Sequence, residues 1–271
     1  MKTISTVTKL KKLAREVALL TLDISYRAKT GHVGSALSIS DILTVLYFSK
    51  LNITLSLLKS DMRDRFILSK GHATAALYAV LYKKKIITRQ QLYSFGQSEG
   101  LCEHPEITQV GIEMTTGSLG HGLAFGVGIA KGLKMKKLKP QVYVLISDGE
   151  CGEGSVWEAA LLAPRLELDN LVVILDYNKW QCFGKVAQIT VLEPLVGKWK
   201  AFGWNVIEVD GHSISQLKKI FSKLPLKNRK PTIVIAHTVS GKGVSLIEDQ
   251  LIGHYKVFSD DEYIQARKEL S

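Results

Sequence analysis

The sequence has few cysteines and few prolines. Its three cysteines, Cys102, Cys151 and Cys182, are odd in number and show no CxxC spacing. That usage argues against a disulfide framework or a zinc site and fits a reducing compartment. Six prolines and 22 glycines in 271 residues are too few for a collagen-like or low-complexity chain.

Long hydrophobic runs are missing as well. No stretch reaches about 18 apolar residues, so we expect no membrane-spanning segment. The N-terminus lacks the uninterrupted apolar middle of a signal peptide and favours an amphipathic helix instead. We therefore predict a cytoplasmic protein.

Acidic residues are fewer than basic ones, 25 against 36, which gives a formal net charge of +11. A basic chain can bind acidic ligands or nucleic acid. The lysines, however, are spread along the whole chain, and no aromatic–basic stacking pattern of an RNA-binding module appears. We interpret these lysines as residues of the solvent-exposed surface, and we expect no nucleic-acid partner.

Hydrophobic residues make up 46% of the chain, which excludes intrinsic disorder. A folded chain of this length buries roughly 70–75% of the surface that its unfolded form exposes, so a large core is available. We find no repeat and no Pro/Ser-rich linker. We therefore predict a single domain over residues 1–271, with a helical segment of about residues 1–60 packing on it.

Short apolar runs alternate with helical patterns in the second half of the chain. The runs lie at 141–147, 170–177, 203–209 and 231–238. Strands that are apolar on both faces and separated by helices predict a doubly wound α/β fold, with a mostly parallel sheet of about five or six strands and helices on both faces. Pro164 should end or kink its helix. Helices are predicted at 5–29, 38–50, 73–83, 120–135, 155–163 and 213–223.

Polar residues follow two of the predicted strands. Asp148 and Gly149 come directly after the first run, and Asn178 follows the second. In parallel sheets, ligands bind outside the carboxyl ends of the strands. A carboxylate and an amide oxygen suit Mg²⁺ or Ca²⁺, and Mg²⁺ commonly bridges to ligand phosphates. Each residue alone could be an ordinary turn residue; together they favour a metal–diphosphate site.

A glycine-rich segment runs from Gly117 to Gly122. No good strand precedes it and no acidic residue follows before Asp148, so it differs from a dinucleotide-binding fingerprint. We interpret it as a tight loop that approaches a ligand and enters a helix. The small residues of that helix should allow close packing; they are Gly122, Ala124, Gly126 and Gly128.

Three of the seven histidines, His32, His72 and His104, lie in turn-like settings. A single such histidine is usually a helix cap or a surface residue. Several of them in a chain with a metal–diphosphate loop favour a role in binding sugar hydroxyls and moving protons near neutral pH.

These motifs together resemble the transketolase family over about residues 10–258. The matching stretches, in chain order, are Gly31-His32, Ser69-Lys70-Gly71-His72, His104-Pro105, Thr116-Gly117-Ser118-Leu119-Gly120, Asp148-Gly149, Glu153-Gly154-Ser155-Val156-Trp157-Glu158, Asn178 and Asp210-Gly211-His212. The resemblance implies thiamine diphosphate and Mg²⁺ (or Ca²⁺) as cofactors.

The resemblance also implies roles for individual residues. Asp148, Asn178 and the main-chain carbonyl of Trp180 would bind the metal. Gly149 and Glu150 would lie beside the diphosphate, and Ser35 and His72 beside the cofactor. The residues expected near the aminopyrimidine are Gly117, Ser118 and Leu119. The residues expected to line the reaction centre as catalytic groups are His32, His72, His104 and His254.

Five positions depart from the family pattern. Ser147 replaces a glycine before Asp148, and Glu103 replaces one before His104. His121 replaces a common glutamine, and Ser240 a common lysine that contacts the cofactor. Tyr255 follows His254 where a glycine is expected. These departures point to a pathway-specific variant, and they leave the sugar substrate open.

The resemblance covers only the thiamine-diphosphate-binding half of a transketolase, so it implies the N-terminal subunit of a split enzyme. The expected partner is a C-terminal subunit with the pyrimidine-binding domain and the glutamate that activates the cofactor, in a heterotetramer. The pair would transfer a two-carbon ketol unit from a ketose, or its phosphate, to an aldose. Two alternatives stay open: another thiamine-diphosphate enzyme half, deoxyxylulose-phosphate synthase-like or acyloin-forming, and a non-catalytic scaffold.

Overall fold

A computed structural model describes residues 6–226 and 228–271. Its centre is a five-stranded sheet in which all neighbouring strands are parallel. The order across the sheet is β1 (Arg65–Leu68), β2 (Val142–Ser147), β3 (Leu171–Tyr177), β7 (Thr232–His237) and β6 (Asn205–Asp210). A small antiparallel hairpin, β4 (Trp180–Gln181) and β5 (Gly184–Lys185), follows β3 directly.

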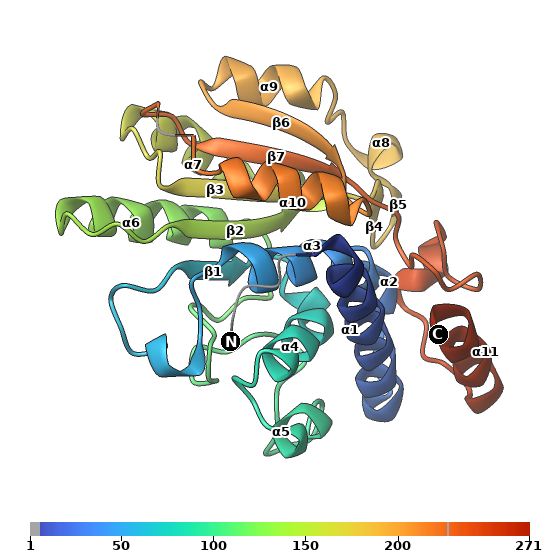
Figure 1. Ribbon diagram of the computed structural model, residues 1–271. Helices are drawn as coiled ribbons and strands as arrows, with labels where there is room; N and C mark the ends of the chain where they lie inside the picture. Colours follow the sequence, from blue (N-terminus) through green and yellow to red (C-terminus); the bar gives the residue numbers. More distant parts are fainter. Residues whose placement is uncertain (1–5, 227) are drawn as a thin grey trace.

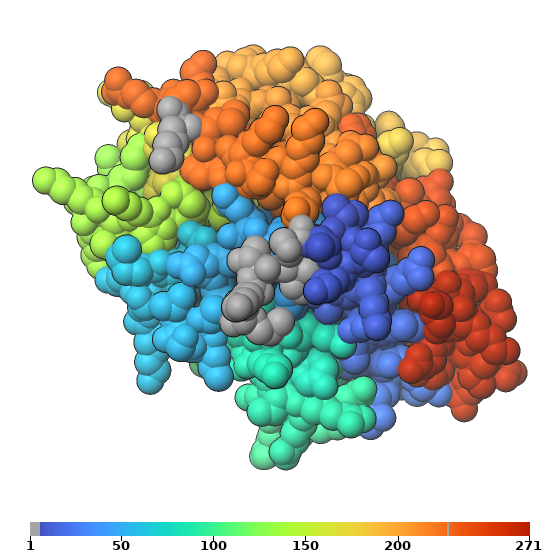
Figure 2. Space-filling model, in the orientation of Figure 1, coloured from blue at the N-terminus to red at the C-terminus, as the bar shows by residue number. Residues whose placement is uncertain are grey.

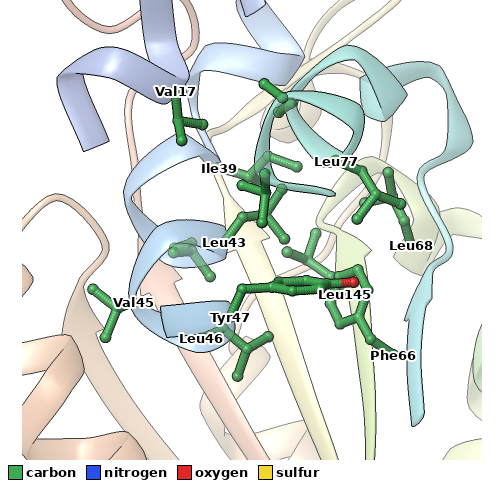
Figure 3. Packing of buried hydrophobic residues seen from close by; sticks show 14 of the residues in the cluster. Val17, Ile39, Leu43, Val45, Leu46, Tyr47, Phe66, Leu68, Leu77 and Leu145 are labelled. Atoms are coloured by element: carbon green, nitrogen blue, oxygen red, sulfur yellow. The ribbon is translucent and has the colours of Figure 1, made fainter. Parts of the chain in front are cut away.

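Helices cover both faces of the sheet (Figure 1), which confirms the predicted α/β fold class. Alternate residues of β2 point to opposite faces, so Tyr143 and Leu145 join one hydrophobic cluster and Val144 joins the other. The first cluster, part of which Figure 3 shows, is covered by α1 (Val7–Ala28), α3 (Ser40–Val45), α4 (Thr74–Lys83) and α10 (Ile214–Lys223). The second is covered by α6 (His121–Met135), α7 (Gly154–Arg165) and α9 (Leu195–Ala201).

The four predicted strands are confirmed as β2, β3, β6 and β7, within two residues at each end. Strand β1 was not predicted, because it has only four residues and begins with a charged arginine. The 5–29 helix is observed as α1, with residue 5 outside the described residues. The 38–50 helix is observed as α3 followed by a π-helical turn over Leu46–Lys50.

Pro164 was predicted to end or kink its helix, and the helix does end close to it. Helix α7 includes this proline and ends one residue later, at Arg165. Among the small residues of α6, Gly122 and Gly126 pack closely, because a Cβ there would lie 2.3 Å from Ser69 Oγ and 2.4 Å from Val144 Cγ2, respectively. Ala124 and Gly128 are exposed instead.

The C-terminal helix α11 (Asp260–Leu270) packs beside α1 (Figure 2). The rings of Tyr26 and Tyr263 stack with centroids 3.9 Å apart, and Tyr263 donates a hydrogen bond to Asp23 at 2.9 Å. The shorter helices are α2 (Val33–Leu37), α5 (Arg89–Tyr93) and α8 (Val186–Ile189), with 3₁₀ turns at Leu55–Leu57, Gly71–Ala73, Gly149–Gly152 and Leu251–His254. Among the described residues, no helix has the length and apolar character needed to cross a membrane.

Because the five strands are parallel, their carboxyl ends all meet at one rim of the sheet. The register pairs Ser147 of β2 with Asp176 of β3, so the segments that follow these strands leave the sheet side by side. Ser69 and Lys70 follow β1 at the same rim, and Thr238 follows β7. This carboxyl-end rim is where a ligand site is expected.

Candidate active site

A cavity of about 240 Å³ opens at the carboxyl-end rim. It brings together segments that lie far apart in the sequence, from α2 to the turn before α11. The predicted site residues that line it are His32, Ser35, His72, His104, Gly117, Leu119, Gly149, Asn178, Trp180 and His254. Of the other predicted site residues, Asp148 and Glu150 are fully buried at the rim, and Ser118 is exposed and is not part of the lining.

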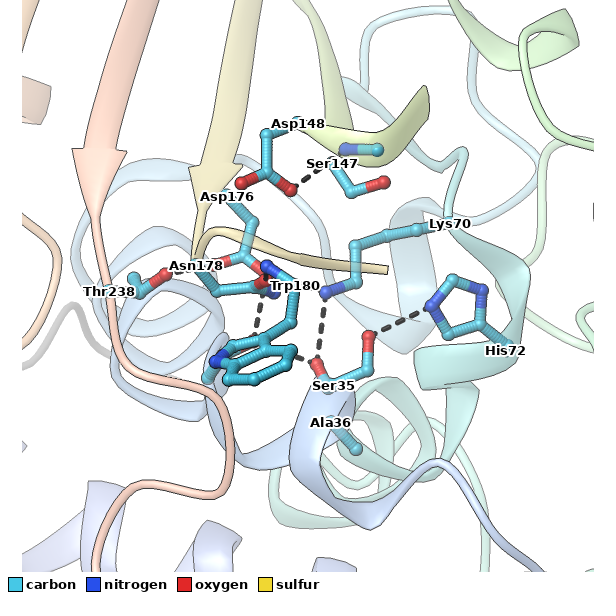
Figure 4. Close-up of polar contacts among 12 residues, drawn as sticks. Ser35, Ala36, Lys70, His72, Ser147, Asp148, Asp176, Asn178, Trp180 and Thr238 are labelled. Carbon is cyan, nitrogen blue, oxygen red and sulfur yellow. Dashed lines mark hydrogen bonds and ion pairs between the residues drawn. The ribbon is translucent and has the colours of Figure 1, made fainter. Parts of the chain in front are cut away.

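The predicted metal ligands lie at the ends of β2 and β3 and in the hairpin that follows (Figure 4). Asp148 accepts hydrogen bonds from the backbone N–H of Lys179 at 2.6 Å and of Gly149 at 2.8 Å. The side-chain oxygen of Asn178 accepts from the backbone N–H of Trp180 at 2.9 Å. The three predicted metal ligands are thus joined through one short network.

The donor set suits a hard cation. Asp148 is completely buried, and burial together with the nearby carboxylate of Asp176 raises its pKa to about 7. A cation at this position would favour the charged carboxylate. Among the described residues, no three His, Cys, Asp or Glu side chains gather into a metal site. The predicted site contains one carboxylate, one amide and one carbonyl, a donor set that matches Mg²⁺ or Ca²⁺.

Three of the histidines that line the cavity lie in mutual contact. The ring of His32 lies 5.2 Å from that of His72 and 4.9 Å from that of His254, measured between centroids. The backbone N–H of His32 donates to the carbonyl of His254 at 3.0 Å, and Ser35 Oγ lies 2.9 Å from His72 Nε2. Within the part of the chain that the structure describes, the buried Nδ1 of His32 has no hydrogen-bond partner.

These three histidines are neutral at pH 7. Burial is the largest cause, and the charges of neighbouring histidines and Lys70 add to it. Together they lower the pKa of His32, the pKa of His72 strongly and the pKa of His254 to about 4. Neutral imidazoles can both accept and donate hydrogen bonds, as a polyhydroxy substrate requires.

The lowered pKa of His254 predicts acid sensitivity. Between about 6.5 and 4, the unfolded chain binds a proton that the folded chain does not, so stability falls as pH falls, by at most ~1.4 kcal/mol per pH unit. We expect His254→Asn to lose less stability than wild type between pH 7 and pH 5, measured by urea unfolding. The exposed His121→Asn is the matched control, and identical pH dependence in all three proteins would contradict this expectation.

The glycine-rich loop contributes Gly117 and Leu119 to the lining of the cavity. Gly117 has φ 154°, and a Cβ there would lie 3.1 Å from the His104 ring, so the loop and this histidine pack closely. Gly120 has φ 87° and donates its N–H to Glu150 at 2.8 Å. Glu150 also accepts hydrogen bonds from Ser69 and from the backbone N–H of Ser147. It therefore anchors the loop beneath the cavity.

The departures from the family pattern fall in two groups. Ser147 and Ser240 line the cavity, whereas Glu103 and His121 are exposed and are not part of its lining. Tyr255 lies outside the lining and donates its hydroxyl to the carbonyl of Cys182. Trp180 Nε1 donates to Asp249 at 2.7 Å, so two bonds fasten the hairpin to the segment that carries His254.

Sequence reasoning missed several residues at this rim. Gln181 and Cys182 of the hairpin line the cavity. Beneath it, Lys70 and Asp176 form a completely buried ion pair at 2.6 Å. Asp176 is the single charged residue within the apolar run 170–177, and that was the signal that could have identified it.

The comparisons with known proteins agree with this geometry. The thiamine diphosphate binding domain of the transketolase family matches residues 9–271. The chain is 41% identical over 251 residues to a subunit of the apulose-4-phosphate transketolase of Phocaeicola vulgatus, covering 92% of this chain and 89% of that protein. It is 38% identical to the 6-deoxy-6-sulfo-D-fructose transketolase subunit of a Clostridium species, covering 95% and 94%.

Longer transketolases match along part of their length. The human transketolase is 36% identical over 91% of this chain, which spans 40% of that protein. The transketolase structure from Campylobacter jejuni superposes with a TM-score of 0.89 at 29% identity, over 98% of this chain and 43% of that one. The chain belongs to the transketolase family, matches its thiamine-diphosphate-binding domain and has that domain's α/β fold.

Proposed function

We propose that this chain is the N-terminal, cofactor-binding subunit of a two-chain transketolase. With its partner it transfers a two-carbon ketol unit from a ketose, or its phosphate, to an aldose, using thiamine diphosphate and Mg²⁺ (or Ca²⁺). One observation carries the proposal: Asn178 and Trp180 line the same cavity as three neutral histidines, and the buried Asp148 carboxylate binds the backbone between these two residues. In this proposal, residues 1–271 form one domain, and the cytoplasmic location stays a prediction.

On the metal side, Asp148, the Asn178 oxygen and the Trp180 carbonyl would hold the cation that neutralises the diphosphate. Gly149 leaves no side chain between the backbone and that position; a Cβ there would already lie 3.0 Å from Gln181 Cβ. The glycine loop, from Gly117 to Leu119, would lie against the aminopyrimidine.

Bound thiamine diphosphate would supply the carbanion chemistry, and the protein would supply binding, orientation and proton handling. His32, His72 and His254 can hold the hydroxyl groups of a ketose, because each has an uncharged ring at neutral pH. His104, against Gly117, would complete the catalytic group at the edge of the cavity.

The partner in this proposal is a C-terminal transketolase subunit with the pyrimidine-binding domain, and the assembly is a heterotetramer. The lengths of the relatives support a separate partner subunit. This chain covers 89% and 94% of the lengths of the two relatives that are named as subunits, whereas it covers 40% of the length of the human transketolase. The proposed substrates are sugars or sugar phosphates. The names of these two relatives specify a sugar phosphate and a sulfosugar, which supports a sugar substrate.

A reconstitution experiment tests the proposal. We expect no ketol transfer by the purified chain alone, because the cofactor-activating glutamate would lie on the partner. Adding a candidate C-terminal subunit, thiamine diphosphate and Mg²⁺ should produce turnover with a ketose donor, and the Asp148→Asn variant is the control that should stay inactive. Sustained turnover by the chain alone would contradict the split site. Product formation from pyruvate would instead favour the acyloin-forming or synthase-like alternative, and cofactor binding without turnover would favour the scaffold.

A further inference from the structure

Asp176 is the centre of a buried hydrogen-bond cluster beneath the cavity (Figure 4). Its carboxylate accepts from Lys70 Nζ at 2.6 Å, from Ser38 Oγ at 2.8 Å and from Asn178 Nδ2 at 2.8 Å. Thr238 donates its hydroxyl to the other carboxylate oxygen. The donors come from the segments that follow β1, β3 and β7 and from the turn between α2 and α3, so four segments of the rim meet at one carboxylate.

The bond to Asn178 determines how that amide is turned. A carboxylate can only accept from the NH₂ group, so Asn178 directs Nδ2 toward Asp176. Its oxygen must then face the other way, where it accepts from the backbone N–H of Trp180. Asn178 is one of the residues that line the cavity. Without the carboxylate, the bond from the Trp180 backbone N–H alone would distinguish the two ends of the amide.

Lys70 extends the cluster to the histidine side. Its completely buried ammonium also donates to the carbonyl of Ser35 at 3.0 Å. The hydroxyl of Ser35 in turn lies 2.9 Å from His72 Nε2. A chain of contacts therefore runs from the Asn178 amide through Asp176 and Lys70 to a histidine of the cavity.

Stability alone gives little reason for such a pair. Two buried charges lose their hydration, and the attraction between them compensates for that loss only narrowly. A protein with well-packed apolar residues of similar volume in place of such a pair is often just as stable. We propose that Asp176 is a positioning residue that turns the Asn178 oxygen toward the metal position and, through Lys70, fixes Ser35 beside His72. This inference rests on the proposed function, since the metal is part of it.

The test measures Mg²⁺ binding to the full chain at saturating thiamine diphosphate, with the partner subunit present, by calorimetry. Asp176→Asn removes the charge, whereas Asp176→Glu keeps the charge opposite Lys70 and displaces the carboxylate by one methylene. Loss of an outer partner of a metal ligand typically costs 10–100-fold in metal affinity, and we expect a loss of about that size in both variants. Circular dichroism verifies that each variant is folded, and Asp176→Glu keeps the test valid if Asp176→Asn does not fold.

Thr238→Val is the matched control, because it removes a donor from the same carboxylate and leaves the bonds to Asn178 and Lys70 in place. We expect its Mg²⁺ affinity to stay within about threefold of wild type. Equal losses in Thr238→Val and Asp176→Glu, or wild-type affinity in folded Asp176→Glu, would overturn the inference.

A crystal structure of Asp176→Glu separates this inference from the proposed function. An Asn178 amide turned away from its wild-type orientation supports the positioning role, and an unchanged amide overturns it, whether or not metal binds. Failure of the wild-type protein to bind Mg²⁺ with thiamine diphosphate would contradict the proposed function alone.

Discussion

Replacing Asp148 with asparagine should abolish the Mg²⁺-dependent part of thiamine diphosphate binding. The variant keeps the size of the side chain and an oxygen that can accept from Lys179, but it removes the one carboxylate of the proposed ligand set. Loss of a ligand should exceed the ~10–100-fold that an outer partner contributes to metal affinity. Calorimetry with and without Mg²⁺, on the chain with its partner subunit, measures the effect.

The matched control for this experiment is Asp61→Asn. Asp61 is an aspartate outside the cavity lining whose side chain is 67% exposed, so its charge should not affect the bound cation measurably. Mg²⁺-dependent affinity that is unchanged in Asp148→Asn would refute the assigned metal role. A loss of equal size in both variants would mean that net charge, and not ligation, governs binding.

The second large effect concerns the packing of α6 on the rim. In Gly122→Ala, the new methyl group would lie 2.3 Å from Ser69 Oγ and 2.9 Å from Ser69 Cα, so side chain and backbone must both move. Overpacking of this kind typically costs ~1–3 kcal/mol of unfolding free energy. Ser69 also binds Gly122 and Glu150, so the glycine loop should shift and cofactor affinity should fall. Denaturant unfolding and calorimetry measure the two effects.

Gly128→Ala on the same helix is the contrasting variant. A methyl group at Gly128 meets no atom within 4 Å, and alanine restricts the unfolded chain more than glycine does. We therefore expect this variant to gain about 0.5–1 kcal/mol of stability. If both alanine variants changed stability in the same direction, the steric explanation for Gly122 would be wrong.

The strands of the fold could be predicted because burial on both faces leaves a plain pattern in the sequence. The runs 141–147 and 170–177 are largely apolar, with Asp176 the one charged residue inside them, and the structure places them as β2 and β3. Strand β1 gives no such pattern, since it has four residues, begins at Arg65 and follows the charged segment 61–64. Its place beside β2 is fixed by pairing with residues almost eighty positions away.

The candidate site could be predicted where its residues stand in short motifs and at strand ends. The histidines and Asn178 were found in that way, and the structure places them around one cavity. The contacts beneath the cavity could not be predicted, because Lys70 and Asp176 are 106 positions apart and nothing local links them. The side-chain environment that turns an amide or lowers a histidine pKa exists only after the chain has folded.

The fastening of the hairpin to the 249–255 segment limits how far this protein can be shortened. Asp249 and Tyr255 form hydrogen bonds with Trp180 and Cys182, although about seventy residues separate the partners in the sequence. A design that cut the chain before residue 249 would keep all five strands of the sheet, yet it would release the loop bearing the Trp180 carbonyl. A shortened form of the protein must therefore keep the residues that hold the cavity loops in place, and the end of the last strand is not a sufficient guide to where it can be cut.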